Sequence, residues 1–350
     1  MERPTFKPIG TPSEELDTPA LVVDLDALDA NIKLVHGAVR ASGASIRPSL
    51  DSHLCPAIGH IQVGAGGTNG VAVSTLGQAE VFSQHGFSDI LLTNLVVTRP
   101  KISRAVALAR RIKLAVLADS ASNVDTLSAA AQSSGSTIGI AVPVRTTTTT
   151  IGVIPSEAPS LAVHIAGSPN VDLAGLVSSS GVEPLLEAAA ACQAAGVHVP
   201  MVAVQGSADL DASAASDGIS DVLADSYALN DNSLASRRPE LQKAARILAT
   251  VVSSKDDGLV WVDAGLKATS IDTGLPAVDN VDGAVVPRMS AEHGALVDEG
   301  NLGWDLDLGS KVWLVPDDIA NTANVYDYIH ATRNGQLEAV WEVSARGRYN

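Results

Sequence analysis

Aromatic residues are scarce in this chain. Phe, Trp and Tyr make up 3% of its 350 residues, whereas 46% of the residues are hydrophobic. A chain of this length can bury one large core or two smaller ones, and this apolar fraction excludes an intrinsically disordered protein. The core therefore has to be built mainly from Ala, Val, Leu and Ile.

Basic residues and cysteines are also few. The chain has 23 Lys and Arg against 39 Asp and Glu, which gives a formal net charge of −16. This balance argues against nucleic-acid or anionic-membrane partners, because both bind patches of positive charge. The two cysteines, Cys55 and Cys192, cannot build a disulfide framework, which fits a reducing compartment.

Long apolar runs are missing. No run approaches the roughly 20 residues that a membrane-spanning helix needs. The first ten residues, MERPTFKPIG, lack the apolar centre of a signal peptide. We therefore expect a cytoplasmic protein with no membrane partner.

Short, continuous apolar runs alternate with helical segments over the first two thirds of the chain. The runs are 21–25, 46–50, 71–75, 90–94, 114–118, 138–144, 173–178, 201–204 and 222–227. Such runs are typical of parallel strands that are buried on both faces. They predict a (β/α)8 barrel over residues 16–248. A doubly wound open sheet is the alternative, but no Gly-x-Gly-x-x-Gly motif follows the first strand.

The pattern changes after about residue 248. Strand-like runs then follow one another with turns and almost no helix, which predicts an all-β domain. We assign residues 249–350 to this domain, together with residues 1–15.

Several motifs carry a resemblance to a known family. The stretch Arg47–Pro56 resembles the pyridoxal-phosphate lysine segment of the D-threonine aldolase and D-serine dehydratase family. Further stretches that look like signatures of the family are 18–24, 75–80, 119–124, 262–267, 290–294 and 343–349. The resemblance implies an alanine-racemase-like (β/α)8 barrel of fold type III with a C-terminal β domain. It also implies a homodimer, pyridoxal phosphate on a lysine, and a divalent metal.

The positions that handle the cofactor depart from this family. Asp51 stands where the family carries its lysine, and a carboxylate has no amine with which to form a Schiff base. The other departures are Arg145 and Thr150 in the ring-contacting loop, Ser179 and Ser180 at the next strand end, Asp209 in the phosphate cradle, and Ala320 in the metal pair. We therefore expect no pyridoxal phosphate and no metal, with Asp318 as a weak remnant of the metal site.

Four residues are candidates for catalysis. Asp51 is a candidate acid or base, His53 a candidate general base, and Arg145 a candidate clamp for a substrate carboxylate. Each also has a structural interpretation: an ion pair between Arg145 and Asp51 or Asp209, and a His53 that holds a turn. Tyr227 is a candidate proton donor, although a satisfied tyrosine at a strand end is the preferred interpretation.

Seven residues are candidates for substrate binding. They are Thr150, Ser179, Ser180, Gln205 and Asp209 at strand ends, and Glu292 and His293 from the β domain. Because chemistry in such barrels occurs at the carboxyl ends of the strands, we expect a small-molecule site there.

Three functional hypotheses remain. The first is a lyase, aldolase, isomerase or cyclase that acts without pyridoxal phosphate on a small carbonyl or carboxylate compound. The second is a non-catalytic pseudoenzyme or ligand-binding protein on the same scaffold. The third and weakest is a lyase that binds pyridoxal phosphate without a covalent bond.

Overall fold

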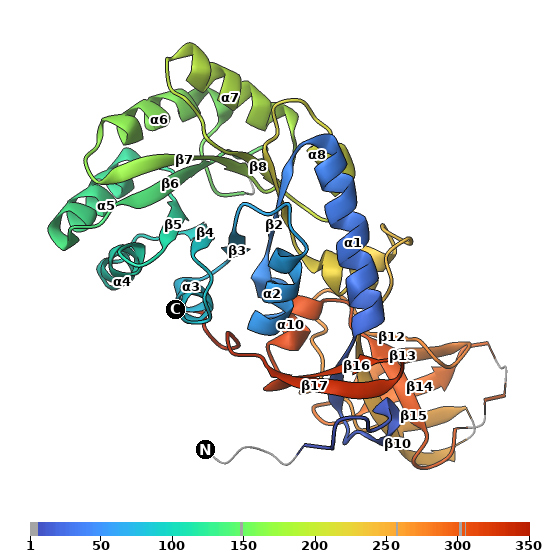
Figure 1. Cartoon of the computed structure of the whole chain (residues 1–350). Helices are drawn as coiled ribbons and strands as arrows, with labels where there is room; N and C mark the ends of the chain where they lie inside the picture. Colours follow the sequence, from blue (N-terminus) through green and yellow to red (C-terminus); the bar gives the residue numbers. More distant parts are fainter. Residues whose placement is uncertain (1–5, 148–149, 257, 301–302, 305) are drawn as a thin grey trace. The chain divides into compact units, whose positions relative to one another are not determined.

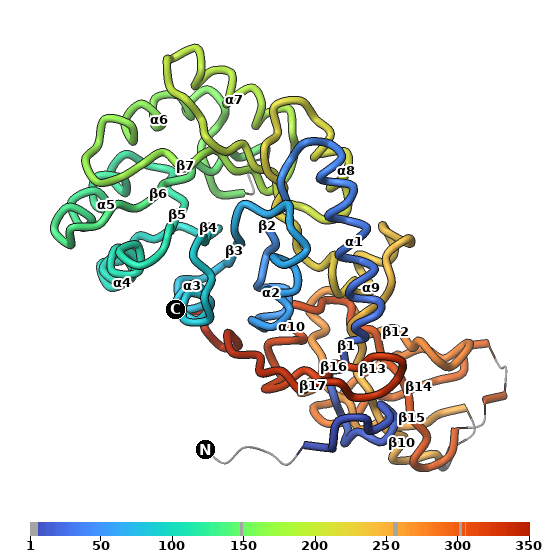
Figure 2. The backbone as a smooth tube through the Cα atoms, in the orientation of Figure 1, coloured from blue at the N-terminus to red at the C-terminus, as the bar shows by residue number. Residues whose placement is uncertain are grey.

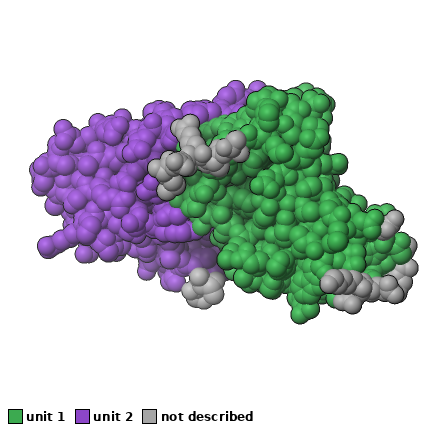
Figure 3. Space-filling model, turned by 90° about the horizontal axis from the view of Figure 1, so that it is seen from below, with its two compact units in different colours: residues 1–33, 52–58, 226–346 green, residues 34–51, 59–225, 347–350 purple. Residues whose placement is uncertain are grey.

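The computed structural model describes residues 6–147, 150–256, 258–300, 303–304 and 306–350. Its residues cluster into two compact units, which Figure 3 shows in different colours. Unit 1 comprises residues 1–33, 52–58 and 226–346, and unit 2 comprises residues 34–51, 59–225 and 347–350.

Unit 2 is built around an eight-stranded parallel sheet that curls into an almost closed barrel (Figure 1). Its strands are β2 (Ser45–Pro48), β3 (Val71–Val73), β4 (Asp89–Leu95), β5 (Lys113–Leu117), β6 (Ile138–Pro143), β7 (Val171–Ser178), β8 (Val202–Gln205) and β9 (Asp221–Ala224). Their order is β2-β9-β8-β7-β6-β5-β4-β3. Parallel bridges between Ile46 and Thr68 and between Ser49 and Ala72 bring β2 beside β3. The predicted barrel is thereby confirmed.

Helices connect the successive strands, and the tube in Figure 2 lets the reader follow this alternation along the chain. They are α1 (Leu25–Ser42), α2 (Pro56–Gly64), α3 (Leu76–Gln84), α4 (Arg99–Ala109), α5 (Ala121–Ser134), α6 (Ala158–Gly167), α7 (Glu183–Ala194) and α8 (Leu210–Ala214). In Figure 1, α5, α6 and α7 lie on the outer side of β6 and β7. The interior of the barrel is therefore left to strand side chains.

Local sequence signals set several helix ends. Thr75 accepts a hydrogen bond from the backbone N–H of Gln78, and the Gln78 side chain accepts one from the backbone of Thr75, so α3 begins with a capping box. Gly135 ends α5 with φ 63°, a left-handed conformation that costs glycine little. These signals fix where each strand gives way to a helix.

The barrel interior is filled by rather small side chains. A buried cluster joins Leu91, Leu117, Val177, Met201 and Leu223 with alanines from neighbouring strands. No aromatic side chain belongs to this cluster of described residues. The low aromatic content thus shows directly in how the barrel is packed.

Unit 1 contains a nine-stranded, mostly antiparallel sheet. Its strands are β1 (Ala20–Asp24), β10 (Ala245–Asp256), β11 (Leu259–Val262), β12 (Ala277–Val278), β13 (Ala284–Met289), β14 (Gly294–Asp298), β15 (Lys311–Val315), β16 (Tyr328–Arg333) and β17 (Gln336–Glu342). Two short helices, α9 (Asn232–Ala235) and α10 (Ile319–Ala323), also belong to this unit.

Strand β1 lies in a different sheet from the one the sequence predicts. Its apolar run was expected in the barrel, but β1 pairs antiparallel with β10 and parallel with β16. All of its residues except Asp24 are buried, so its burial is the same as that of a barrel strand. A run that is buried on both faces shows that a strand is central, but not which sheet contains it.

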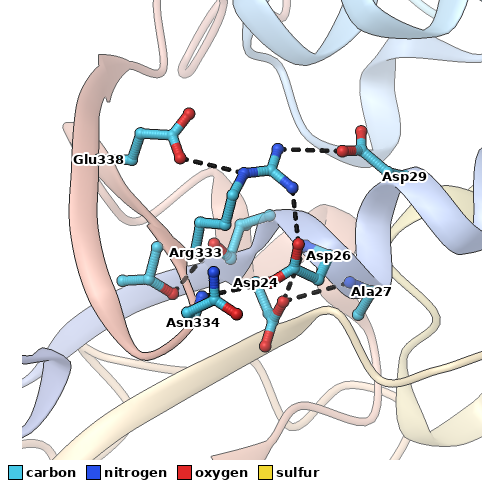
Figure 4. Close-up of polar contacts among 9 residues, drawn as sticks. Asp24, Asp26, Ala27, Asp29, Arg333, Asn334 and Glu338 are labelled. Atoms are coloured by element: carbon cyan, nitrogen blue, oxygen red, sulfur yellow. Dashed lines mark hydrogen bonds and ion pairs between the residues drawn. The ribbon is translucent and has the colours of Figure 1, made fainter.

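An ion-pair cluster ties β16 to the start of α1 within unit 1 (Figure 4). Arg333 contacts Asp26 at 2.6 Å, Asp29 at 3.0 Å and Glu338 of β17 at 3.0 Å. Hydrogen bonds to Asp29 and Asp26 raise the pKa of Arg333. The side chain of Asp24 caps α1 by accepting from the N–H of Asp26 at 2.9 Å.

Among the described residues, no helix combines the length and the apolar character that a membrane crossing requires.

Candidate active site

The mouth of the barrel, meaning the carboxyl ends of β2–β9, collects the candidate residues of unit 2. The strands are parallel, so the residues that follow them meet at one edge of the sheet. Asp51 follows β2 in a short 3-10 turn, Leu50–Ser52. Arg145 follows β6, which lies four places from β2 in the ring of eight strands. The carboxylate and the guanidinium therefore come from opposite sides of the mouth.

Asp51 is held by a hydroxyl from the neighbouring strand end. Ser74, directly after β3, donates a short hydrogen bond from its Oγ to Oδ2 of Asp51. The backbone N–H of Ser74 donates to Oε1 of Gln78 at 3.0 Å, which fixes the serine at the start of α3. The capping box of α3 thus positions the hydroxyl that orients the carboxylate.

Arg145 has a backbone anchor and, among the residues that the structure describes, no anionic partner. Its N–H donates to the carbonyl of Val153 at 2.9 Å. Its Nε is buried and makes no hydrogen bond to any described residue. The sequence left open an ion pair with Asp51 or Asp209, and among the described residues Arg145 forms neither. A half-buried cation that forms no ion pair with the described residues is suited to bind a substrate anion.

Hydroxyl groups line the mouth beside β6 and β7. The Oγ1 of Thr146 and the Oγ of Ser180 lie 3.1 Å apart, and Ser178 donates to the carbonyl of Ser180 at 2.6 Å. Ser179 is exposed. Thr150 donates to the carbonyl of Thr147 at 3.4 Å, while Thr148 and Thr149 lie outside the described residues.

The ends of β8 and β9 are joined by polar contacts. Nε2 of Gln205 donates to Oδ1 of Asp225 at 3.5 Å, and the N–H of Asp225 donates to Oγ of Ser207 at 2.8 Å. Asp209 is exposed at the start of α8 and makes no capping hydrogen bond with its side chain. The sequence analysis named Gln205 and Asp209 but gave Asp225 and Ser207 no role.

The remaining candidates belong to unit 1. His53 is fully buried, and its Nδ1 accepts from the N–H of Cys55 at 3.0 Å, as expected of a histidine that holds a turn. Tyr227 is fully buried in the 3-10 turn Ser226–Ala228. Glu292 forms a short ion pair with Lys267, and the N–H of the exposed His293 donates to Ser290.

The side chain of Asp318 accepts hydrogen bonds from the backbone at the start of a helix. Its Oδ1 accepts from the N–H of Ala320 at 2.8 Å and of Asn321 at 3.2 Å, which caps α10. Among the described residues, no group of three or more His, Cys, Asp or Glu side chains is arranged to hold a metal ion.

Cys55 is buried beside the turn. Burial raises the pKa of its thiol to about 11, so the thiolate is scarce near neutral pH. Since the thiolate is the reactive form, this side chain is suited to packing and not to nucleophilic attack.

Ser74 belongs to the candidate site, but the sequence did not predict it. It comes directly after the apolar run of β3, in Val73-Ser74-Thr75, and so carries the strand-end signal by which Ser179 and Gln205 were found. Its contact with Asp51 depends on β2 lying beside β3, which the chain order alone does not reveal.

Comparisons with known proteins agree with this architecture. A family model for the alanine racemase N-terminal domain matches residues 23–217, and one for a serine dehydratase domain matches residues 244–332. A 3-hydroxy-D-aspartate aldolase from Paracoccus denitrificans (strain Pd 1222) is 32% identical, over 97% of this chain and 94% of the relative.

Two solved structures extend the similarity. The D-threonine aldolase from Filomicrobium marinum superposes with a TM-score of 0.94 at 29% identity, over 98% of this chain and 99% of that one. A D-threo-3-hydroxyaspartate dehydratase, a cysteine-to-alanine mutant in the metal-free form, has a TM-score of 0.82 at 26% identity. That match covers 95% of this chain and 98% of the dehydratase.

These relatives contradict the expectation that the chain uses no cofactor. They are aldolases and a dehydratase of a pyridoxal-phosphate- and metal-dependent kind, and they align with nearly the whole chain. The expectation rested on single positions, namely the mouth residues for pyridoxal phosphate and Asp318 and Ala320 of unit 1 for the metal, whereas the similarity extends over both units. The relatives therefore point to cofactors, and that prediction was wrong.

The residues at the mouth do not fit covalent attachment of pyridoxal phosphate at the family's position. Residue 51 is a carboxylate that accepts a hydrogen bond from Ser74, and it offers no amine. A pyridoxal phosphate placed here would have no covalent bond to this residue.

The sequence identity, the two family models and the superposition lead to the same conclusion. The relative and the solved structure align with nearly the whole chain, and the two models match the barrel and the β domain. The chain belongs to the D-threonine aldolase and 3-hydroxy-D-aspartate aldolase family, which has the alanine racemase N-terminal fold.

Proposed function

We propose that this protein is a lyase-type enzyme that cleaves a small β-hydroxy amino acid at the mouth of the barrel. The observation that carries the proposal is the Asp51 carboxylate, held by Ser74 where a barrel of this kind places its chemistry. The relatives named above are aldolases and a dehydratase of β-hydroxy amino acids, which supports this substrate class.

Asp51 is the proposed acid–base group. Cleavage of a β-hydroxy acid requires a proton to leave or reach the hydroxyl oxygen, and a positioned carboxylate performs such transfers. The hydrogen bond from Ser74 occupies Oδ2 and orients the carboxylate. His53 is proposed as a positioning residue, since its Nδ1 is engaged by the backbone of Cys55.

Arg145 is the proposed clamp for the substrate carboxylate. Its guanidinium makes no ion pair with the described residues, and a bidentate pair with a carboxylate both binds and orients the ligand. The hydroxyls of Thr150, Ser179 and Ser180 and the amide of Gln205 are proposed to bind the polar groups of the substrate.

The proposal is tested by replacing Asp51 with Asn. Turnover of D-threonine and of 3-hydroxy-D-aspartate is measured by release of aldehyde or of 2-oxo acid, with pyridoxal phosphate and a divalent metal supplied. We expect kcat to fall by a factor of about 10² to 10⁴, the usual contribution of a general acid or base. The control is Glu187→Gln, the same chemical change on the exposed surface of α7.

An unchanged rate in Asp51→Asn would remove Asp51 from the mechanism. A wild-type protein that binds the amino acid but releases no product would instead support a ligand-binding pseudoenzyme. That second candidate is favoured by one observation, the missing amine at position 51.

We also infer a homodimer located in the cytoplasm. The family resemblance supports the dimer, and the two buried, unpaired cysteines are compatible with a reducing compartment. Native mass spectrometry measures the subunit number directly, and a monomer at micromolar concentration would refute the inference.

A further inference from the structure

A cavity lies at the end of the barrel opposite to the mouth. Its volume is about 550 Å³, within the usual range of ligand pockets. It is lined by residues at the amino ends of the strands, including Asp89 and Lys113 at the starts of β4 and β5, and Asp221 at the start of β9. We call this space the base cavity.

The base cavity exists because one layer of the barrel interior is built from very small residues. Ala115 of β5 pairs in register with Gly139 of β6. A Cβ placed on Gly139 would lie 3.1 Å from the Cβ of Ala115 and 3.3 Å from that of Ala174 on β7. Bulky branched side chains usually fill such a layer, so three small residues in contact leave it hollow.

The wall of the base cavity offers one buried guanidinium whose hydrogen-bonding capacity is only partly used within the described part of the chain. Arg47 is 5% exposed. Its Nη1 donates to Asp89 at 2.8 Å and to the carbonyl of Val71 at 3.3 Å. Its Nε has no hydrogen-bond partner among the described residues, and none of them accepts from Nη2. A guanidinium that is buried but only half satisfied is costly unless a ligand completes it.

Carboxylates complement this cation. Asp89 is occupied by Arg47 and by Lys113, each at 2.8 Å. Asp221 accepts from Asn69 at 3.3 Å. Asp172 is exposed on the rim and pairs with no described residue. The five charged residues sum to −1, which disfavours phosphate or another polyanion.

We propose that the base cavity is a binding site for a small neutral amino acid. The carboxylate of the ligand would pair with Arg47, and its ammonium would pair with Asp172 at the rim. Its apolar side chain would fill the hollow beside Ala115, Ala174 and Met201. This site lies at the opposite end of the strands from Asp51 and does not depend on the proposed lyase activity.

Leucine is the probe, and Met201 is the reporter. The chain has only three methionines, Met1, Met201 and Met289, so carbon-13 labelling of the methionine methyl groups gives a simple spectrum. Met201 lines the base cavity, whereas Met289 lies on β13 in unit 1. We expect leucine to shift the Met201 signal in a saturable way and to leave the Met289 signal in place.

Two variants, one control variant and two leucine analogues make the test specific. Ala174→Leu fills the hollow and Asp172→Asn removes the free carboxylate, so each is expected to weaken leucine binding at least about tenfold, or 1.4 kcal/mol. Ala174→Ser, which adds almost no volume, keeps the affinity. 4-Methylpentanoate, which lacks the ammonium, and 3-methylbutylamine, which lacks the carboxylate, are expected to bind at least about tenfold more weakly.

Asp51→Asn is the control for binding at the mouth. We expect leucine to shift the Met201 signal of this variant as it does in the wild-type protein. A Met201 signal that does not move up to about 10 mM leucine would overturn the proposal. A leucine affinity that Asp172→Asn leaves unchanged would also overturn it, and this exposed substitution tests the site even if Ala174→Leu fails to fold.

Discussion

The two ends of the barrel use charge in opposite ways. At the mouth, Asp51 is bound by a neutral hydroxyl and Arg145 has no anionic partner among the described residues. At the base, Asp89 joins Arg47 and Lys113 in a chain of ion pairs. Barrels of this type generally place chemistry at the carboxyl ends and stability at the amino ends of the strands. In the proposed function the charges of the mouth serve a ligand, whereas most charges of the base pair with one another.

The base departs from this division in one respect. A chain of ion pairs beside a filled interior would serve stability alone, but Ala115, Gly139 and Ala174 leave a hollow next to it. The contrast teaches that the end of the barrel that supports stability can also hold a binding site when one interior layer is built from small residues.

The change with the largest expected effect introduces an amine at the mouth. In Asp51→Lys, the new amine would stand where the sequence resemblance places the family's lysine, so we expect borohydride to fix added pyridoxal phosphate on residue 51. In the wild-type chain residue 51 is an aspartate, which has no amine and cannot form this adduct. Intact mass and peptide mapping measure the adduct. An adduct on another lysine of the wild-type chain would show that a substitute amine serves the mouth.

Breaking the ion-pair chain at the base tests its structural role. Asp89→Ala leaves the buried guanidinium of Arg47 without its carboxylate, and we expect a loss of about 2–3 kcal/mol in the free energy of unfolding. Urea denaturation measures it. Asp172→Ala is the matched control, because this exposed carboxylate pairs with no described residue, and it should change stability by less than about 0.5 kcal/mol. Equal losses in both variants would remove the distinction.

Removing the free cation of the mouth should change binding more than stability. For Arg145→Met we expect KM to rise about 10- to 100-fold, because a charged hydrogen bond contributes about 1.5–3 kcal/mol. Steady-state kinetics and a thermal melt are measured together, with Arg110→Met as the control at the end of α4. A large loss of stability with an unchanged KM would assign Arg145 to the scaffold.

The smallest expected effect concerns how the stability of the fold depends on pH. Burial lowers the pKa of His36, whose Nδ1 donates to the carbonyl of Gly66 at 2.9 Å. The unfolded chain therefore binds this proton at a higher pH than the folded one, so stability is lost as the pH falls below the usual value of 6.5. Urea denaturation of His36→Gln at a series of pH values should show a weaker loss. The exposed His198→Gln should follow the wild-type profile.

Much of the fold could be predicted from the sequence because it rests on local signals. The run 90–94 corresponds to β4, and the run 114–118 to β5, each within about a residue. Buried β-branched runs followed by helices are the signature of parallel strands, and the family motifs specified the barrel further. The position of β1 could not be predicted in this way, because its burial is the same in either sheet.

The candidate site was predicted only as a set of strand ends. The sequence placed Asp51 and Arg145 at the mouth. It did not show that the hydroxyl of Ser74 contacts Asp51, or that Arg145 forms no ion pair within the described ranges. Which polar groups meet depends on strand order, and strand order is set by long-range pairing.

By itself the sequence determined the βα repeats, the change to β structure, the family and the presence of a carboxylate at position 51. Apolar periodicity, turn residues and motifs are local properties that a linear chain displays directly. Only the tertiary structure decided that Ser74 binds Asp51, that β1 joins the nine-stranded sheet, and that Ala115 stands beside Gly139 to open the base cavity. These features follow from the register and order of strands far apart in the chain, which the packing of the whole molecule selects.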